Sequence, residues 1–263
     1  MRPLAVAHLT ALDLAPVELL RKAAQVGFSA VGLRLHPVQP GATGYPLEAG
    51  SAAARELKAA IAGESVQVSD IEFVSLTPAF QLADHEGLLA AGAELGASSL
   101  TVSGDDLDNA RLVHNLAALC ELASGYGLRV DLEFMRWRAV ANVQQAVAAV
   151  AATGQRNAGV LVDALHLYRS GGDEQALAQL DSRFLRAVQL CDAPLQAPAE
   201  ALIIQEAREG RLLPGSGQLP LAALLNALPA DVQVSVETPS ALLAPDLRLK
   251  AAYEATRSWL SRS

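Results

Sequence analysis

A regular alternation of short apolar runs with amphipathic stretches constrains the fold of this chain more than any other feature. Each run is rich in Val, Leu or Ile, and most are flanked by turn-forming residues, which is typical of β-strands. Eight such runs predict strands at Leu4–Leu9, Ala30–Leu35, Val66–Val74, Ser99–Val102, Arg129–Phe134, Gly159–Val162, Ala187–Leu190 and Val232–Val236. Apolar residues recur at helical spacing between them, for example in Pro16–Gln25, Ala52–Ala62, Asp84–Leu95 and Leu107–Ser124.

Eight strand–helix units in 263 residues correspond to about 33 residues per unit, which is the size of a βα unit. Alternating units of this kind predict an α/β fold with a parallel sheet, and eight of them close most simply into one (β/α)8 TIM barrel. We therefore expect a single domain over residues 1–263. An open doubly wound sheet is the alternative, but it normally has a Gly-rich phosphate turn after its first strand. The segment HLTALDLAP, which follows the first run here, contains no glycine.

The charge of the chain argues against polyanionic partners. The net charge is −8 and the isoelectric point about 5.1, so we expect no affinity for nucleic acid or anionic membranes. Cys120 and Cys191 lie far apart in apolar segments, which favours two buried thiols and a reducing compartment. No signal-peptide pattern and no run of about 18 apolar residues is present. We expect a soluble, cytoplasmic protein that acts on a small molecule.

Polar residues stand at the carboxyl ends of four successive apolar runs. They are Glu133 in VDLEF, Asp163 in VLVDALH, Gln189 in VQLCD and Glu237 in VSVETP. In a barrel the carboxyl ends of the strands meet at one face, where TIM-barrel active sites lie. Three carboxylates and one amide oxygen at this face predict a site for one divalent ion such as Mn, Mg, Co or Zn. The alternative is that each residue only caps a loop or pairs with an arginine.

Histidines supply the candidate acid–base groups. His166 follows Asp163 by three residues, and its ordinary pKa near neutrality suits a general acid or base. The alternative for His166 is a loop histidine packed under the rim. His8 and His36, at the ends of the first two predicted strands, are candidates for substrate contact or for structural capping. His85 and His114 fall in predicted helices, where we expect them on the surface.

Arg211, in REGRLLPGSG, is a candidate clamp for a substrate anion, because a guanidinium binds a carboxylate or phosphate at two points. A salt bridge to Glu209 or Asp192 is its alternative role. We also expect Asp192 to cap the loop after the seventh strand.

Further candidates for the substrate pocket lie near other strand ends. Arg34 is a second candidate clamp, and Glu72 could line the pocket or form an ion pair with Arg34. Trp137, which follows EFMR, is either a lid over an apolar substrate face or a packed loop residue.

The order and spacing of several segments resemble those of the xylose isomerase-like TIM barrels, also called the sugar phosphate isomerase/epimerase or AP endonuclease family 2 superfamily. These segments are GFSAVGLRLHP, DIEF, DLEF, VDALHLYRSG, VQLCDAP, REGRLLPGSG and SVETPS. The resemblance covers nearly the whole chain and implies that Glu133, Asp163, Gln189 and Glu237 are metal ligands. It also implies an Asp-x-x-His role for His166, and a pocket bordered by the R-x-x-P-G-x-G turn.

Two positions depart from the commonest family pattern. Many members have His where this chain has Gln189, a replacement typical of hydroxypyruvate isomerase-like and some 3-dehydroshikimate dehydratase-like members. Many relatives have an acidic residue where Ser216 stands. Members often pair, so a homodimer is compatible with the resemblance. The DNA-repair branch needs three zinc ions and many histidines, which a chain with five histidines does not provide.

The predicted site suits chemistry on a vicinal hydroxyl and carbonyl. A Lewis-acidic ion would stabilise the enolate formed by proton loss, with Glu133 or Glu237 as base and His166 as proton donor. The leading hypothesis is a metal-dependent isomerase or epimerase of a sugar or small hydroxy-keto compound. The second is a lyase, a dehydratase of 3-dehydroshikimate or an inosose. The third is a non-catalytic sugar-binding barrel.

Overall fold

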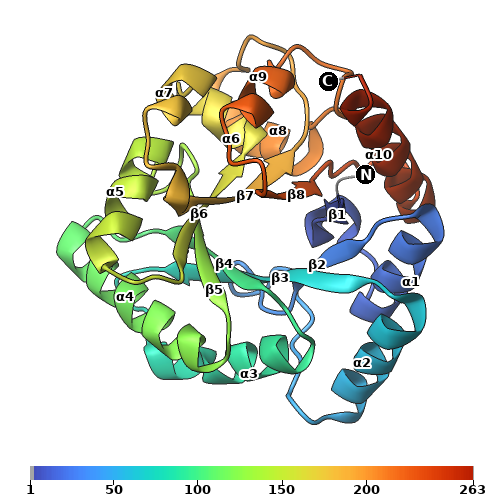
Figure 1. Cartoon of the computed structure of the whole chain (residues 1–263), viewed down its shortest axis with the longest axis vertical. Helices are drawn as coiled ribbons and strands as arrows, with labels where there is room; N and C mark the ends of the chain where they lie inside the picture. Colours follow the sequence, from blue (N-terminus) through green and yellow to red (C-terminus); the bar gives the residue numbers. More distant parts are fainter. Residues whose placement is uncertain (1–2, 263) are drawn as a thin grey trace.

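Eight parallel strands form a closed barrel, as the alternating pattern predicts (Figure 1). The computed structural model describes residues 3–262. Each strand pairs with the next in sequence, and β8 pairs with β1 to close the ring. The strands are β1 Ala5–Val6, β2 Ala30–Arg34, β3 Gln67–Leu76, β4 Ser99–Gly104, β5 Arg129–Glu133, β6 Ala158–Asp163, β7 Leu185–Leu190 and β8 Gln233–Val236.

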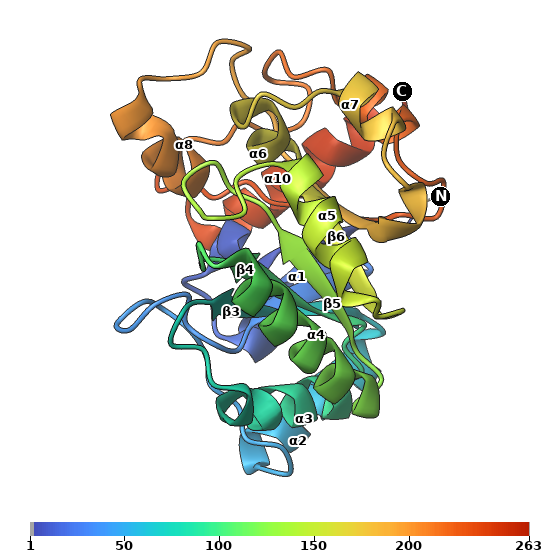
Figure 2. The same cartoon turned by 90° about the vertical axis from the view of Figure 1, so that its left-hand side faces the viewer.

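Helices surround the barrel on the outside (Figures 1 and 2). The long ones are α1 Pro16–Val26, α2 Ala52–Glu64, α3 Glu86–Glu94, α4 Asn109–Gly125, α5 Val143–Thr153 and α10 Pro245–Leu260. Shorter helices are α6 Ala164–Arg169, α7 Glu174–Ala178, α8 Ile203–Glu209 and α9 Leu221–Asn226. Four 3₁₀ turns complete the described elements: η1 His8–Ala11, η2 Leu82–His85, η3 Ser182–Phe184 and η4 Glu200–Leu202.

Local sequence signals explain where several helices begin and end. Helices α2, α4 and α5 start at Ser51, Asp108 and Asn142, whose side chains accept hydrogen bonds from backbone N–H groups in the first turn. Helix α1 has Pro16 at its first position and ends at Gly27, whose φ of 113° suits glycine. The apolar faces of these helices pack on the Val- and Leu-rich strands and form one continuous core.

The eight predicted strands are confirmed, with changes in their bounds. The first is shorter than expected, because only Ala5 and Val6 pair with neighbouring strands. His8 therefore begins η1 instead of ending a strand. The segment after β7, expected as a loop, contains the helix α8. No helix within residues 3–262 is long and apolar enough to span a membrane.

Candidate metal and substrate site

The four predicted ligands lie at the carboxyl ends of neighbouring strands. Glu133 ends β5, Asp163 ends β6, Gln189 is the penultimate residue of β7, and Glu237 directly follows β8. All four are at most 5% exposed, and the register pairs Asp163 with Gln189. The barrel thus places the three carboxylates and the amide on one side of the rim, with little access to water.

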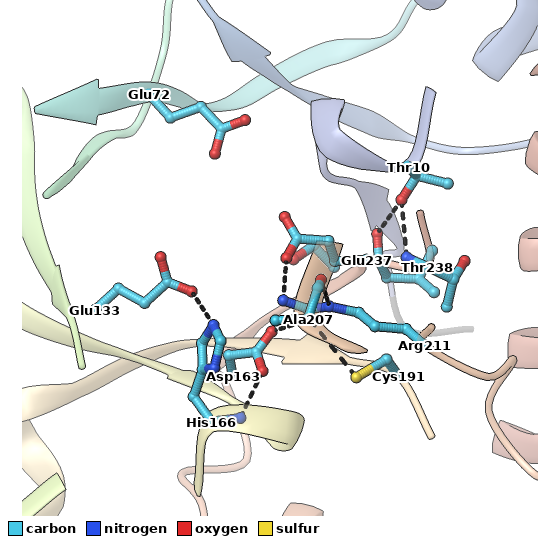
Figure 3. A network of polar contacts seen from close by, with 12 residues as sticks. Thr10, Glu72, Glu133, Asp163, His166, Cys191, Ala207, Arg211, Glu237 and Thr238 are labelled. Atoms are coloured by element: carbon cyan, nitrogen blue, oxygen red, sulfur yellow. Dashed lines mark hydrogen bonds and ion pairs between the residues drawn. The ribbon is translucent and has the colours of Figure 1, made fainter. Parts of the chain in front are cut away.

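Arg211 lies among these carboxylates (Figure 3). Its Nη1 is 2.5 Å from Oδ2 of Asp163, and its Nη2 is 2.9 Å from Oε2 of Glu237. Its Nε donates a hydrogen bond of 2.7 Å to the carbonyl of Ala207 in α8. The Arg211 side chain is 2% exposed. Its partners are therefore two predicted metal ligands, and neither Glu209 nor Asp192 as the alternative interpretation supposed.

His166 occupies the first turn after β6, close to two carboxylates. Its backbone N–H donates to Oδ1 of Asp163 at 2.9 Å, so the carboxylate caps the start of α6. Its Nε2 is 3.7 Å from Oε1 of Glu133, and the ring meets the edge of Trp137 (Figure 3 shows the first pair). Burial lowers the pKa of His166 to about 4, so the imidazole is neutral near pH 7. A neutral imidazole beside a carboxylate can pass a proton in either direction.

Burial and neighbouring charges shift the pKa values of the three carboxylates in different directions. Burial, followed by the charges of Glu237 and Asp163, raises the pKa of Glu133 well above its usual value. Burial also raises the pKa of Glu237 to about 7, although the Arg211 guanidinium opposes the shift. Burial would raise the pKa of Asp163 too, but the charge of Arg211 and the contacts with His166 hold that pKa below its ordinary value. A site of this kind favours a bound cation.

The residues present fit a divalent ion. The ligand atoms of Glu133, Asp163 and His166 lie within 4.8 Å of one another, and no other group of at least three His, Cys, Asp or Glu residues within residues 3–262 meets that criterion. Oε1 of Gln189 is buried and has no hydrogen-bond partner, which is costly unless the oxygen has another role. Carboxylate oxygens, an amide oxygen and an imidazole nitrogen are ligands for Mg, Mn, Co or Zn.

A cavity of about 240 Å³ opens beside the carboxylates. Its polar wall includes Glu133, His166, Arg211 and Glu237. The other residues that line it are Leu9, Leu12, Arg34, Val38, Gln39, Ala42, Thr43, Glu72, Phe73, Met135, Trp137, Arg138, Ala207 and Arg208. Its volume lies just below the roughly 300–1,000 Å³ usual for ligand pockets, so it suits a small ligand.

Of the other predicted pocket residues, Arg34, Glu72 and Trp137 reach the cavity. Nη2 of Arg34 is 3.2 Å from Oε1 of Glu72, so the two form the ion pair that was their alternative role. Trp137 lines the cavity and contacts the ring of His166. Asp192 accepts hydrogen bonds from three backbone N–H groups and so caps its loop as expected.

The predicted histidines on the first two strands have structural partners instead. Nε2 of His8 bonds to the carbonyl of Leu14, and its Nδ1 accepts from the backbone N–H of Arg34. Nδ1 of His36 bonds to the carbonyl of Phe73. Neither histidine lines the cavity, and His8 is completely buried.

The expectation for the helical histidines is half correct. His114 is exposed, whereas His85 is buried and stacks on Phe80. The rings of His85 and His36 also make a T-shaped contact, with their centroids 5.6 Å apart. The 3₁₀ turn η2 directs the His85 ring inward, a detail that helical periodicity does not reveal. Cys120 and Cys191 are free buried thiols, as the sequence predicts.

Eleven of the eighteen residues that line the cavity were not predicted from the sequence, and four of them illustrate why. Met135 and Arg138 belong to the loop after β5, and Ala207 and Arg208 to α8. Met135 and Arg138 could have been predicted, because residues that directly follow the end of a strand face the mouth of a barrel. Ala207 and Arg208 lie in the segment after β7, whose position the pattern of strands does not determine.

Comparison with known proteins finds a family model and curated enzymes that are similar to this chain. A family model described as Xylose isomerase-like TIM barrel matches residues 20–262. A curated relative from Pseudomonas aeruginosa, 3-dehydroshikimate dehydratase, is 33% identical over 136 residues. That match covers 51% of this chain and 21% of the relative, so it spans only about a fifth of the length of that protein.

Solved structures share the fold along the whole chain. The IOLI protein with a bound zinc atom superimposes with a TM-score of 0.81 at 18% identity, covering 99% of both chains. The probable 3-DHS dehydratase AsbF from Bacillus anthracis gives a TM-score of 0.79 at 13% identity, covering 97% of this chain and 99% of its own. At these identities the similarity concerns the fold.

Proposed function

This chain belongs to the xylose isomerase-like TIM barrel family, and on that basis we propose that it is a divalent-metal-dependent enzyme acting on a small hydroxy-ketone. We propose further that it dehydrates its substrate, as a 3-dehydroshikimate dehydratase does. The observation that carries the proposal is the rim cluster of Glu133, Asp163, Gln189 and Glu237. A neutral His166 lies beside Glu133 in this cluster.

The four rim residues would hold the ion, and the zinc atom of the structurally similar IOLI protein supports a divalent metal here. When bound, the ion would supply a Lewis acid for two vicinal substrate oxygens. The unpartnered Oε1 of Gln189 is explained by such a cation, which would also offset the burial and the repulsion that raise the pKa of Glu133.

The side chains of this protein would move the protons. Glu133 is the better base of the two glutamates, because Glu237 is engaged by Arg211. Glu133 would take the proton from the carbon next to the carbonyl, and the electron pair of that C–H bond would form the new double bond as the β-hydroxyl leaves. Glu133 would pass this proton to Nε2 of the neutral His166, 3.7 Å away, and the imidazolium so formed would protonate the departing hydroxyl as water. Both side chains would then be back in their starting protonation states.

Dehydration is favoured over isomerisation by the sequence relative. The 3-dehydroshikimate dehydratase is 33% identical over 136 residues of this chain, whereas the solved structures are similar in fold alone. Isomerisation or epimerisation remains the second candidate, because Glu133 and Glu237 approach the cavity from two different strands. Two carboxylates on different strands could remove a proton and return it to another face of the substrate.

The proposal is tested by incubating the purified protein with Mn²⁺ or Mg²⁺ and 3-dehydroshikimate. Formation of 3,4-dihydroxybenzoate, followed by its ultraviolet absorbance, is the expected result. Glu133→Gln should abolish turnover, while Glu200→Gln, at an exposed ion pair with Arg136, should leave it unchanged. Turnover that survives in Glu133→Gln would contradict the assignment of the base. Keto-sugar conversion in place of dehydration would favour the second candidate, and neither reaction with any ion would refute both.

A further inference from the structure

The Arg211 side chain is bound by the carboxylates that we propose as metal ligands. Three of its nitrogens are engaged by the protein, at Ala207, Asp163 and Glu237. Nη1 is also 3.6 Å from Sγ of Cys191. With 2% of its side chain exposed, Arg211 has little freedom to turn toward an incoming anion.

The loop that carries Arg211 is fixed at both sides. Leu212 and Asp192 exchange two backbone hydrogen bonds of 2.8 Å. The Asp192 carboxylate accepts from the backbone N–H groups of Gly215 and Leu219, both at 3.0 Å. Movement of the Arg211 backbone would break these bonds. The backbone contacts hold the loop, and the three contacts of the guanidinium hold the side chain.

Each ion pair of Arg211 uses one oxygen of a carboxylate. Asp163 contributes Oδ2 and Glu237 contributes Oε2, and an ionised carboxylate offers two oxygens with about four acceptor positions. Oδ1 of Asp163 also accepts from the backbone N–H of His166, but it keeps a second acceptor position for an ion. The two-point contact of Arg211 restricts the rotation of both carboxylate side chains. Arg211 can therefore remain in place while the same carboxylates bind a metal.

The charges of this set match a doubly charged ion. Glu133, Asp163 and Glu237 contribute three negative charges when ionised, and Arg211 contributes one positive charge, which leaves −2. Removing Arg211 would leave −3, the charge that complements a trivalent ion. A buried site with excess charge of either sign is costly, so this balance affects which ion binds best.

We infer that Arg211 is a specificity-determining residue of the metal site, a fixed positive charge that makes three carboxylates select a divalent over a trivalent cation. The inference rests on the proposed function, since it concerns the same metal. It assigns Arg211 a role toward the ion, while the substrate-clamp role expected from the sequence stays a prediction, because Arg211 also lines the cavity.

The test measures binding of Tb³⁺ and Mn²⁺ without any substrate. Tb³⁺ is followed by its emission sensitised by the tryptophan of the cavity, and Mn²⁺ by electron paramagnetic resonance of the free ion. Arg211→Gln should raise the ratio of Tb³⁺ to Mn²⁺ affinity by about tenfold or more, because a nearby unit charge acts more strongly on the more highly charged ion. The double variant Arg211→Gln/Glu237→Gln returns the set to −2, and its ratio should return to within about threefold of wild type.

Two further variants keep the test decisive. Arg169→Gln removes an equally buried arginine, paired with Glu206 outside the cavity, and should leave the ratio unchanged. If Arg211→Gln does not fold, Glu237→Gln alone lowers the set to −1 and should reduce the ratio by about tenfold. A ratio in Arg211→Gln within about twofold of wild type, or a double variant that does not return, would overturn the inference while leaving the metal site intact. Failure of wild type to bind either ion would overturn the proposed function and the inference together.

Discussion

Asp192→Asn is the substitution that most sharply tests how the loop bearing Arg211 is held. The Asp192 carboxylate is 2% exposed, and it accepts from three backbone N–H groups. Oδ1 receives those of Ala193 at 2.9 Å and Leu219 at 3.0 Å, and Oδ2 receives that of Gly215 at 3.0 Å. An asparagine replaces one of these oxygens by an NH₂ group, which cannot accept.

The magnitude follows from counting these bonds. The asparagine would keep its oxygen at the Oδ1 position, where two bonds are retained, and its NH₂ would face the N–H of Gly215. A lost hydrogen bond to a charged acceptor costs about 1.5–3 kcal/mol, and the two retained bonds weaken because the acceptor is no longer charged. We expect the free energy of unfolding to fall by about 2–4 kcal/mol.

Urea unfolding followed by circular dichroism measures this change. The matched control is Asp181→Asn, since Asp181 also accepts from a backbone N–H, that of Arg183, but is exposed. Its exposed ion pair with Arg183 is worth under about 1 kcal/mol, so the control should stay close to wild type. A free energy of unfolding for Asp192→Asn within about 1 kcal/mol of wild type would refute the reasoning, because the loop would then not depend on this carboxylate.

Three further predictions concern stability and turnover. Burial, with a smaller contribution from Glu72, raises the pKa of Asp70 from 3.8 to about 7. The folded state therefore binds this proton more tightly than the unfolded state, and the resulting stability, present below about pH 4, is lost as the pH rises through about 7. In urea unfolding, Asp70→Asn should abolish this loss of unfolding free energy between pH 4 and pH 7, which amounts to about 4 kcal/mol. An unchanged dependence of the unfolding free energy on pH would contradict the raised pKa of Asp70. Gly217→Ala should destabilise the fold by about 2 kcal/mol or more. A Cβ there would lie 2.5 Å from the carbonyl oxygen of Ala193 and still closer to the Asp192 carboxylate. A thermal unfolding temperature equal to that of wild type would show that the loop can adjust. Glu237→Gln should abolish turnover of 3-dehydroshikimate while leaving the circular dichroism spectrum unchanged, and retained activity would remove Glu237 from the site.

Periodicity is what made the fold predictable from the sequence. Eight apolar runs at near-regular spacing leave few arrangements other than a barrel, and each of the eight coincides with a strand. Bounds were less predictable, since β1 pairs only through Ala5 and Val6 and the chain turns into η1 at His8. Whether the residues after a strand continue it depends on neighbouring strands, which a local pattern does not contain.

The candidate site was predictable where it depends on strand ends and unpredictable where it depends on loops. Glu133, Asp163, Gln189 and Glu237 lie on the rim because the strands place them there. The partners of Arg211 were not foreseen, because its loop folds back over the rim through α8 and the Asp192 contacts. A loop of this length can place a guanidinium in many positions, and only packing selects one.

The metal content of the purified protein tests the central claim most directly. Inductively coupled plasma spectrometry is applied to wild type and to Glu133→Ala after incubation with Mn²⁺, Mg²⁺, Co²⁺ or Zn²⁺ and removal of free ions. The account predicts about one ion per chain in wild type and its loss in a Glu133→Ala variant with an unchanged circular dichroism spectrum. No ion in wild type, or equal amounts in both proteins, would contradict a metal centre built on these strand ends.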